Sequence, residues 1–277
     1  MRVTDITAVP EATALAGGRG SRRVWWSRLP PAGWTGVLLV AFIAFWQTSA
    51  VAGWVPAAIV PRFDEVVLAG IEEIEAGLFV ENLASTVIAT VAAHLVGSMV
   101  GLVVGVLFWR KESLGRMFEP YLVSFYAVPL VVFYPVALVV LGINDWPIII
   151  LSTVMAAIPM ALNAWNGFAG IPPVYLRLAD SLTASSRQTF FQVAIPAAAP
   201  LLYTGTMLAA IYALIGVVAM EFMVARNGLG SRIRYLYEAF DNPGMYFYIV
   251  STLAVSILLV GLLNVLFRRA FPRVLAS

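Results

Sequence analysis

Long apolar runs separated by short polar segments dominate the chain. Six runs are long enough to cross the roughly 30 Å hydrocarbon core of a bilayer as helices. They lie near residues 33–54, 83–109, 118–142, 145–169, 195–222 and 243–267. The runs are continuously apolar rather than alternating, which excludes the strands of a closed barrel and leaves helices that satisfy their backbone groups internally. The pattern predicts an all-α membrane protein with six transmembrane helices, in which a polar tail, residues 1–32, precedes one transmembrane domain, residues 33–277.

Composition supports this class and narrows the chemistry. Hydrophobic residues make up 61% of the chain and charged residues 12%, whereas soluble domains carry about 25% charged residues. The chain has no cysteine, which excludes disulfides and thiolate metal sites. A single histidine argues against a metal site with several ligands.

Basic residues are unevenly divided between alternate connecting segments. With the N-terminus inside, thirteen lysines and arginines fall in inner segments and four in outer ones. Since these residues concentrate in cytoplasmic segments, both termini are predicted to be cytoplasmic, and the basic charge indicates orientation rather than nucleic-acid binding. The basic and tryptophan-containing stretch 22–28 predicts contact with anionic membrane lipid. The inner set is Arg2, Arg19, Arg22, Arg23, Arg28, Arg110, Lys111, Arg116, Arg177, Arg187, Arg268, Arg269 and Arg273, and the outer set is Arg62, Arg226, Arg232 and Arg234.

The outer connection after the first run, about residues 55–82, is acidic and has helical periodicity. Val67, Ile71, Ile74 and Leu78 fall on one helical face, and acidic residues occupy the other. This spacing predicts an amphipathic helix on the outer surface.

Small residues recur every four positions in the second run, at Gly97, Gly101 and Gly105. Such spacing lets two helix backbones approach closely. The stripe is therefore a helix-packing face, which either packs within the chain or lines the subunit interior or a dimer seam.

Prolines interrupt the apolar pattern of two runs. Pro129 and Pro135 lie in the third run, and Pro147 and Pro159 in the fourth. They predict kinked or interrupted helices, an arrangement found both in ordinary bundles and around transport pathways.

Polar side chains inside the runs are candidates for a solute pathway, because placing them in lipid is costly. They are His94, Tyr126, Tyr134, Asn163 and Glu221. Each can instead be a hydrogen-bonded packing group. For Glu221 the two interpretations are a gate and a structural pair with an outer-loop arginine.

A polar segment of about two dozen residues separates the fourth and fifth runs. A short helix from about Val174 to Leu182, a polar turn and a second helical stretch from Gln188 are predicted within the loop 170–195. Pro196 restarts a membrane helix at a position where the missing N–H costs no hydrogen bond. Two short helices at an angle present a knob that a separate protein can move as a lever.

This segment resembles the cytoplasmic coupling loop of importer-type ABC permeases, whose pattern is Glu-Ala-Ala, then a glycine, then a hydrophobic residue and proline. Arg177-Leu178-Ala179, Thr183 and Ile195-Pro196 occupy these positions. Arg177 replaces the usual acid, and Asp180 stands where a basic residue is frequent. Without glycine the turn must form without the easy left-handed conformation. The residues that the resemblance assigns to ATPase coupling are Arg177, Leu178, Ala179, Asp180, Ser181, Leu182, Thr183, Ala184 and Ser185.

The resemblance extends over about residues 34–270, through Pro61–Val66, Tyr126–Leu130, Ala213–Phe222 and Asn227–Gly230, and the nitrate/sulfonate/taurine permeases are the most similar branch. It implies a second copy of this permease, two ABC ATPase subunits that bind ATP and magnesium, and an extracytoplasmic solute-binding protein, in a bacterial inner membrane. The chain has no G-x-x-x-x-G-K-[ST] loop, so neither catalysis nor a cofactor is expected in it.

The implied solute is a small anion such as a sulfonate, taurine or nitrate, while pyrimidine precursors and aromatic acids stay open. The alternative functions are a secondary transporter and a non-catalytic membrane subunit of another complex. A secondary transporter would need intramembrane carboxylates for a coupling ion, and the runs offer only Glu221 and Asp145.

Overall fold

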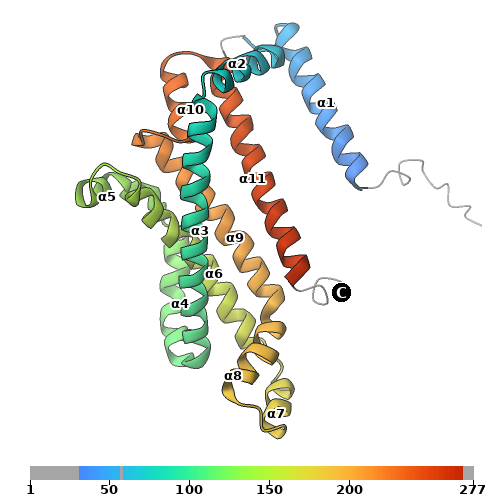
Figure 1. Ribbon diagram of the computed structural model, residues 1–277, viewed down its shortest axis with the longest axis vertical. Coiled ribbons are helices and arrows are strands. Elements are labelled where there is room, and N and C mark those ends of the chain that lie inside the picture. The colour runs from blue at the N-terminus through green and yellow to red at the C-terminus, as the bar shows by residue number, and fades with distance from the viewer. Residues whose placement is uncertain (1–30, 57–58, 271–277) are drawn as a thin grey trace, which may run out of the picture. The chain divides into compact units, whose positions relative to one another are not determined.

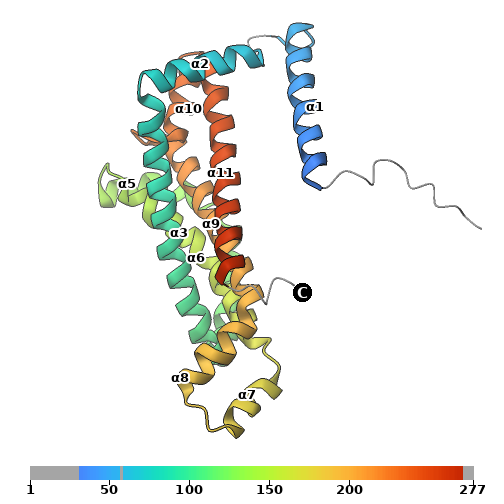
Figure 2. The ribbon, with the colours of Figure 1, turned by 45° about the vertical axis from the view of Figure 1, so that its right-hand side comes forward.

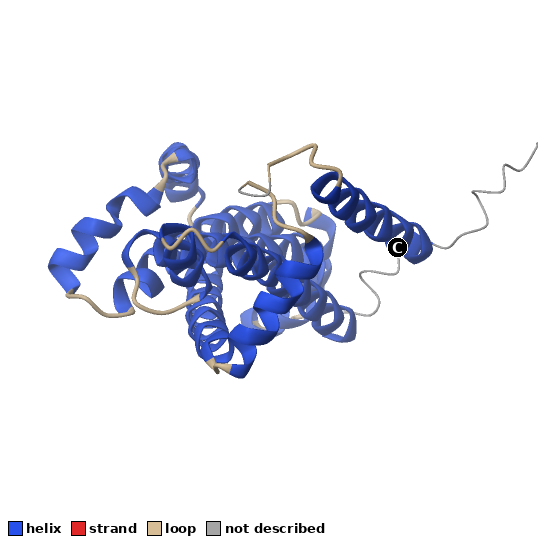
Figure 3. Ribbon diagram, turned by 90° about the horizontal axis from the view of Figure 1, so that it is seen from above, coloured by secondary structure: helices blue, strands red, loops and turns tan. Residues whose placement is uncertain are grey.

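The computed structural model describes residues 31–56 and 59–270, and every regular element within these ranges is helical (Figure 1, Figure 3). The elements are α1 (Pro31–Val51), α2 (Phe63–Glu75), α3 (Leu78–Arg110), α4 (Glu112–Ala127), the 3-10 helix η2 (Leu130–Phe133), α5 (Tyr134–Leu141), α6 (Trp146–Ala169), α7 (Pro173–Ser181), α8 (Ser186–Gln188), the π-helix η3 (Thr189–Ala194), α9 (Ile195–Val224), α10 (Leu229–Glu238) and α11 (Asn242–Ala270).

Five of the described helices are long and apolar enough to cross a membrane: α1, α3, α6, α9 and α11. A sixth candidate exists if the bent pair of α4 with η2 and α5 is counted as one span. The predicted all-helical membrane class is confirmed, with five to six candidate spans.

The third apolar run, predicted over 118–142 with a kink or interruption at its prolines, is broken in the structure. Its two helical parts, Glu112–Phe125 and Leu130–Leu141, meet at 80°. Val128 is extended, with φ −78° and ψ 125°, because the ring of Pro129 disfavours the helical conformation of the preceding residue. In the fourth run, by contrast, Pro147 lies in the first turn of α6, which continues without interruption past Pro159 to Ala169.

The chain divides into two compact units, Met1–Thr48 and Ser49–Ser277. The described part of the first unit is most of α1, where Phe42 and Trp46 make an edge-to-face contact with ring centroids 6.2 Å apart.

The core of the second unit lies where α3, α6 and α9 run side by side (Figure 1, Figure 2). Its buried residues are mainly alanines, including Ala93, Ala156, Ala209 and Ala213, each with no exposed surface. Small side chains allow the close backbone approach on which helix association in lipid depends.

Polar elements gather at the two opposite ends of this helix bundle. Figure 2 shows α7 and α8 at one end and α2 with α10 at the other, joined by the long helices α3, α9 and α11. These are called the α7–α8 end and the α2–α10 end below. Since α3 has 33 residues, the ends are separated by about 50 Å at a rise of about 1.5 Å per residue.

Candidate functional site

The α7–α8 end carries the predicted coupling loop. α7 is followed by a turn over 182–185, and α8 and η3 then lead without a break into α9. Ala179 is buried, whereas Leu178 and Leu182 are 57% and 70% exposed. Arg177, Asp180 and the other predicted coupling residues except Ala184, which is half-buried, are also exposed. The loop therefore presents apolar and charged groups together, as a docking surface requires.

The turn after α7 corrects one expectation from the sequence. Thr183 itself adopts the left-handed conformation, with φ 53°, although it is β-branched. Two hydrogen bonds hold it there, from the N–H of Thr183 to Asp180 O at 3.0 Å and from the N–H of Ala184 to Ala179 O at 3.0 Å. The second bond closes a Schellman-type helix end. The loop thus keeps the backbone shape that a glycine would give.

The second short helix begins with a capping box. The side chain of Ser185 accepts from the N–H of Gln188 at 3.3 Å, and Gln188 Oε1 accepts from the N–H of Ser185 at 2.8 Å. These bonds satisfy two backbone groups that a helix start leaves unpaired. The direction of the chain leaving the turn is therefore set locally.

An aromatic stack attaches the loop to the bundle. Phe190, in the π-helix η3, lies 5.8 Å from Phe168 of α6, which in turn lies 5.1 Å from Trp109 of α3, measured between ring centroids. The guanidinium of Arg110 lies 5.9 Å from the Phe190 ring centroid. The stack thus joins the loop to two long helices, α3 and α6. This stack was not predicted from the sequence, although aromatic residues at adjoining ends of two runs were an available signal.

The glycine stripe of α3 packs against α6 of the same chain. A Cβ at Gly101 would lie 2.5 Å from the carbonyl oxygen of Ala157, and one at Gly105 would lie 2.5 Å from the Cβ of Ala164. Gly97 faces Ala156 in the same way. In the structure the three glycines thus pack against α6 of the same chain, which is one of the interpretations that the sequence left open.

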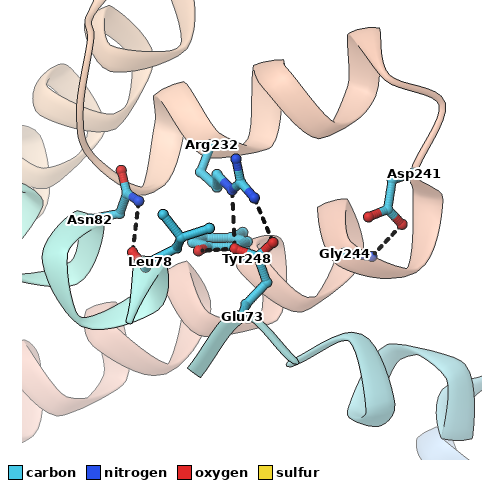
Figure 4. Close-up of polar contacts among 7 residues, drawn as sticks. All are labelled: Glu73, Leu78, Asn82, Arg232, Asp241, Gly244 and Tyr248. Atoms are coloured by element: carbon cyan, nitrogen blue, oxygen red, sulfur yellow. Dashed lines mark hydrogen bonds and ion pairs between the residues drawn. The ribbon is translucent and has the colours of Figure 1, made fainter. Parts of the chain in front are cut away.

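At the α2–α10 end, three helices meet at one carboxylate (Figure 4). Glu73 of α2 accepts from Arg232 of α10 at 2.6 and 3.0 Å and from the hydroxyl of Tyr248 of α11 at 2.7 Å. Burial alone raises the pKa of Glu73, but the hydrogen bonds and the charge of Arg232 outweigh it, so this pKa lies below its usual value. Sequence reasoning missed this cluster, since 159 residues separate Glu73 from Arg232.

Glu221 forms a second polar cluster at this end, where α9 meets α3. Only 1% of its surface is exposed. The hydroxyl of Thr86 lies 2.9 and 2.8 Å from its two carboxylate oxygens, and the N–H of Gly230 donates to it at 3.0 Å. Gly228, with φ 110°, passes so close to the carboxylate that a Cβ there would overlap it. The cluster fixes the turn between α9 and α10 onto α3.

An arginine pair for Glu221 was one expectation, but Arg232 and Arg234 bond other groups. Arg232 pairs with Glu73. Arg234 donates to the carbonyl groups of Met223 and Ala225 at the end of α9.

The other predicted pathway residues are scattered through the bundle. His94 is 5% exposed with its Nδ1 3.3 Å from the hydroxyl of Ser98, and Tyr134 is 1% exposed in an apolar cluster. Asn163 donates to the carbonyl of Pro159 at 2.8 Å and borders a small cavity with Leu208. Tyr126 lies in α4, and its side chain is outside the described residues. Among the described side chains, no hydrogen bond joins His94, Tyr134 or Asn163 to one another.

Comparison with known proteins agrees with this architecture. The family described as "Binding-protein-dependent transport system inner membrane component" matches residues 97–274. The formylaminopyrimidine transport permease protein ThiX of Halalkalibacterium halodurans is 27% identical over 54% of this chain and 60% of its own length. The putative aliphatic sulfonates transport permease protein SsuC of Bacillus subtilis is 27% identical over 84% of this chain and 83% of its own length.

A structural relative has the same fold. A chain of the MetNI methionine ABC transporter in an inward-facing conformation has a TM-score of 0.61 at 24% identity, covering 69% of this chain and 95% of its own. Several curated relatives are matched over only about three fifths of their length, 58–60%. The family profile, in contrast, spans more than half of the residues of this chain. The chain belongs to the family of inner membrane components of binding-protein-dependent transport systems.

Proposed function

We propose that this chain is the permease subunit of an ATP-driven importer, and that it forms the solute pathway with a second copy of itself. In this proposal the bent pair counts as one span, so that six spans leave both termini in the cytoplasm, the α7–α8 end on the cytoplasmic side and the α2–α10 end toward the solute-binding protein. ATP is bound and hydrolysed by two separate ATPase subunits. The division of basic residues, thirteen inner and four outer, supports this orientation.

The observation that carries the proposal is the exposed pair of short helices at the α7–α8 end. Leu178 of α7 and Leu182, which caps its C-terminus, are exposed to solvent. The aromatic stack joins the segment that follows to α3 and α6. An ATPase that moves α7 would therefore move the bundle. The capping box at Ser185 and the bonded turn at Thr183 keep the segment stiff enough to act as a lever.

Glu221 supports the importer over a secondary transporter. A coupling ion would need a carboxylate that is free to bind it. Glu221 is instead engaged by Thr86 and Gly230, which supports a structural role rather than ion coupling.

The solute we propose is a small organic or inorganic anion, such as a sulfonate, taurine or nitrate. Relatives that carry sulfonate and nitrate names support this class. A formylaminopyrimidine is the second candidate, because a permease of that name also matches. Thermal-shift screening of the partner solute-binding protein against both classes, followed by stimulation of ATPase activity in the reconstituted complex, distinguishes them.

The coupling role is tested by replacing residues 177–190 with a Gly/Ser linker of equal length. We expect co-purification of the ATPase subunit to be lost. A Gly/Ser replacement of residues 142–145, between α5 and α6, is the matched control and should retain the ATPase. If the linker variant retains both the ATPase and transport, the coupling role is wrong.

A further inference from the structure

The turn between α10 and α11 holds a phenylalanine in a backbone conformation that favours glycine. Phe240 has φ 59°, and with Thr183 it is one of two non-glycine residues of positive φ among the described residues. The N–H of Asp241 bonds Leu236 O at 2.9 Å, which closes a Schellman-type end on α10. For a side chain with a Cβ, the left-handed conformation costs about 1–2 kcal/mol.

Burial does not offset this cost. Phe240 is 89% exposed, and Tyr235 and Tyr237 on α10 are 57% and 61% exposed. Asp241 accepts from the N–H of Gly244 at 3.1 Å and so fixes the start of α11 (Figure 4). The turn therefore presents an aromatic ring to the surroundings on a rigid support. Backbone hydrogen bonds rather than burial of the ring hold this conformation, from the N–H of Phe240 to Tyr237 O at 3.1 Å and from the N–H of Asp241 to Leu236 O. Residues in such conformations cluster at functional sites.

The position of the turn indicates water rather than lipid around the ring. Tyr248 bonds Glu73 beside Arg232, and these charged groups lie at or beyond the membrane boundary because charge in hydrocarbon is costly. Asn242 begins α11 six residues before Tyr248, which places the turn about 9 Å farther from the middle of the bundle at about 1.5 Å per residue.

The charge at this end also disfavours an anionic membrane surface as the occupant. α2 carries five acidic residues against one arginine at its N-cap. Glu238, just before the turn, has a side chain that is 67% exposed and lies 3.9 Å from Arg234 in an ion pair. Anionic lipid headgroups would be repelled, whereas a protein face with basic residues around an apolar socket would be attracted.

We propose that Phe240 is an anchor residue through which the extracytoplasmic solute-binding protein docks on this permease, by inserting its ring into an apolar socket ringed by lysine or arginine. The proposal rests on the proposed function, because that orientation places the α2–α10 end outside the cell. An exposed aromatic residue on a rigid support has the character of an interface hot spot. Its low conformational freedom reduces the entropy lost on binding.

The test separates the ring from the backbone conformation. Phe240→Gly and Phe240→Asn remove the ring and suit the left-handed conformation, whereas Phe240→Tyr keeps both the ring and the strain. We expect Phe240→Gly and Phe240→Asn to weaken the binding of the purified solute-binding protein to the nanodisc-reconstituted complex at least tenfold. Neither substitution should lower the melting temperature of the permease. Phe240→Tyr should stay within threefold of the wild type. Ile257→Ala, a change at an equally apolar residue of α11 that is 71% exposed, should leave binding unchanged.

A single thiol locates the ring. The chain has no cysteine, so Phe240→Cys carries a spin label at this site alone. We expect a water-soluble relaxation agent to reach the label, and addition of the solute-binding protein to protect it. A label reached mainly by oxygen dissolved in lipid would overturn the proposal in favour of a membrane contact.

The outcomes separate this inference from the proposed function. If the wild type and Phe240→Gly bind the solute-binding protein equally, the anchor is wrong and the importer function stands. If the wild type binds neither that protein nor an ATPase subunit, both are wrong.

Discussion

The contact between α3 and α6 gives the sharpest prediction for stability, through Gly101→Ala. The added Cβ would lie 2.5 Å from the carbonyl oxygen of Ala157 and 2.7 Å from the Cβ of Met160. A backbone oxygen can move only if α6 moves with it. The substitution therefore forces the two helices apart along the face where the core alanines pack.

The magnitude follows from comparison with a glycine in open space. Around Gly261 in α11, no atom lies within 4 Å of a built Cβ. Replacing either glycine by alanine gains up to about 1 kcal/mol of helix propensity, and this gain cancels between the two variants. The difference in unfolding free energy is then the overpacking cost at Gly101, about 1–3 kcal/mol.

The assay is the melting temperature of both purified variants and the wild type in the same detergent. At roughly 2–4 °C per kcal/mol for a chain of this size, Gly101→Ala should melt at least about 2 °C below Gly261→Ala. Equal melting temperatures, or a more stable Gly101→Ala, would refute the close approach of α3 and α6.

Three further predictions concern the two ends. Glu73→Gln should lower the free energy of unfolding by about 1.5–3 kcal/mol at neutral pH, because it weakens hydrogen bonds to the charged Arg232. Since the pKa of Glu73 is lowered in the folded protein, the difference in stability between wild type and variant should shrink as the pH falls below about 4. Thermal melts recorded across this pH range measure the difference. Glu221→Ala should lower the melting temperature more than Glu221→Gln, which retains an oxygen for the N–H of Gly230, and equal effects would argue against the cluster. Phe190→Leu should leave ATPase co-purification intact while lowering solute uptake per ATP hydrolysed in proteoliposomes, because it removes the ring stacked on Phe168; an unchanged ratio would contradict transmission through the stack.

Much of the fold could be predicted from the sequence because a bilayer allows few solutions. The run placed at 145–169 is α6, Trp146–Ala169, and the run at 243–267 is α11, Asn242–Ala270. The loop between the fourth and fifth runs was also predicted as two short helices, and α7 and α8 occupy it. Hydropathy and the positions of prolines along the chain are enough to predict these helices and this loop.

One local feature was predicted only in part, and another was missed. Pro129 and Pro135 predicted a kinked or interrupted helix in the run 118–142, and in the structure Val128 before Pro129 is extended and the helix bends by 80°. Thr183 takes a left-handed conformation that its side chain disfavours, because the bonds to Asp180 and Ala179 outweigh the cost. Residue type alone predicts neither the angle of the bend at Pro129 nor the left-handed conformation of Thr183.

The sequence by itself determined the class of protein, most of its helix boundaries, and the position of the loop between α6 and α9. Only the tertiary structure decided that Thr86 holds Glu221 across 135 residues, that Glu73 holds Arg232 across 159, and that Phe240 stands exposed in a strained turn. Hydropathy shows that a segment is buried in lipid because every residue of a span contributes to it additively. The partner of a single polar side chain depends on which helix faces touch, and no periodicity along one helix specifies the neighbouring face.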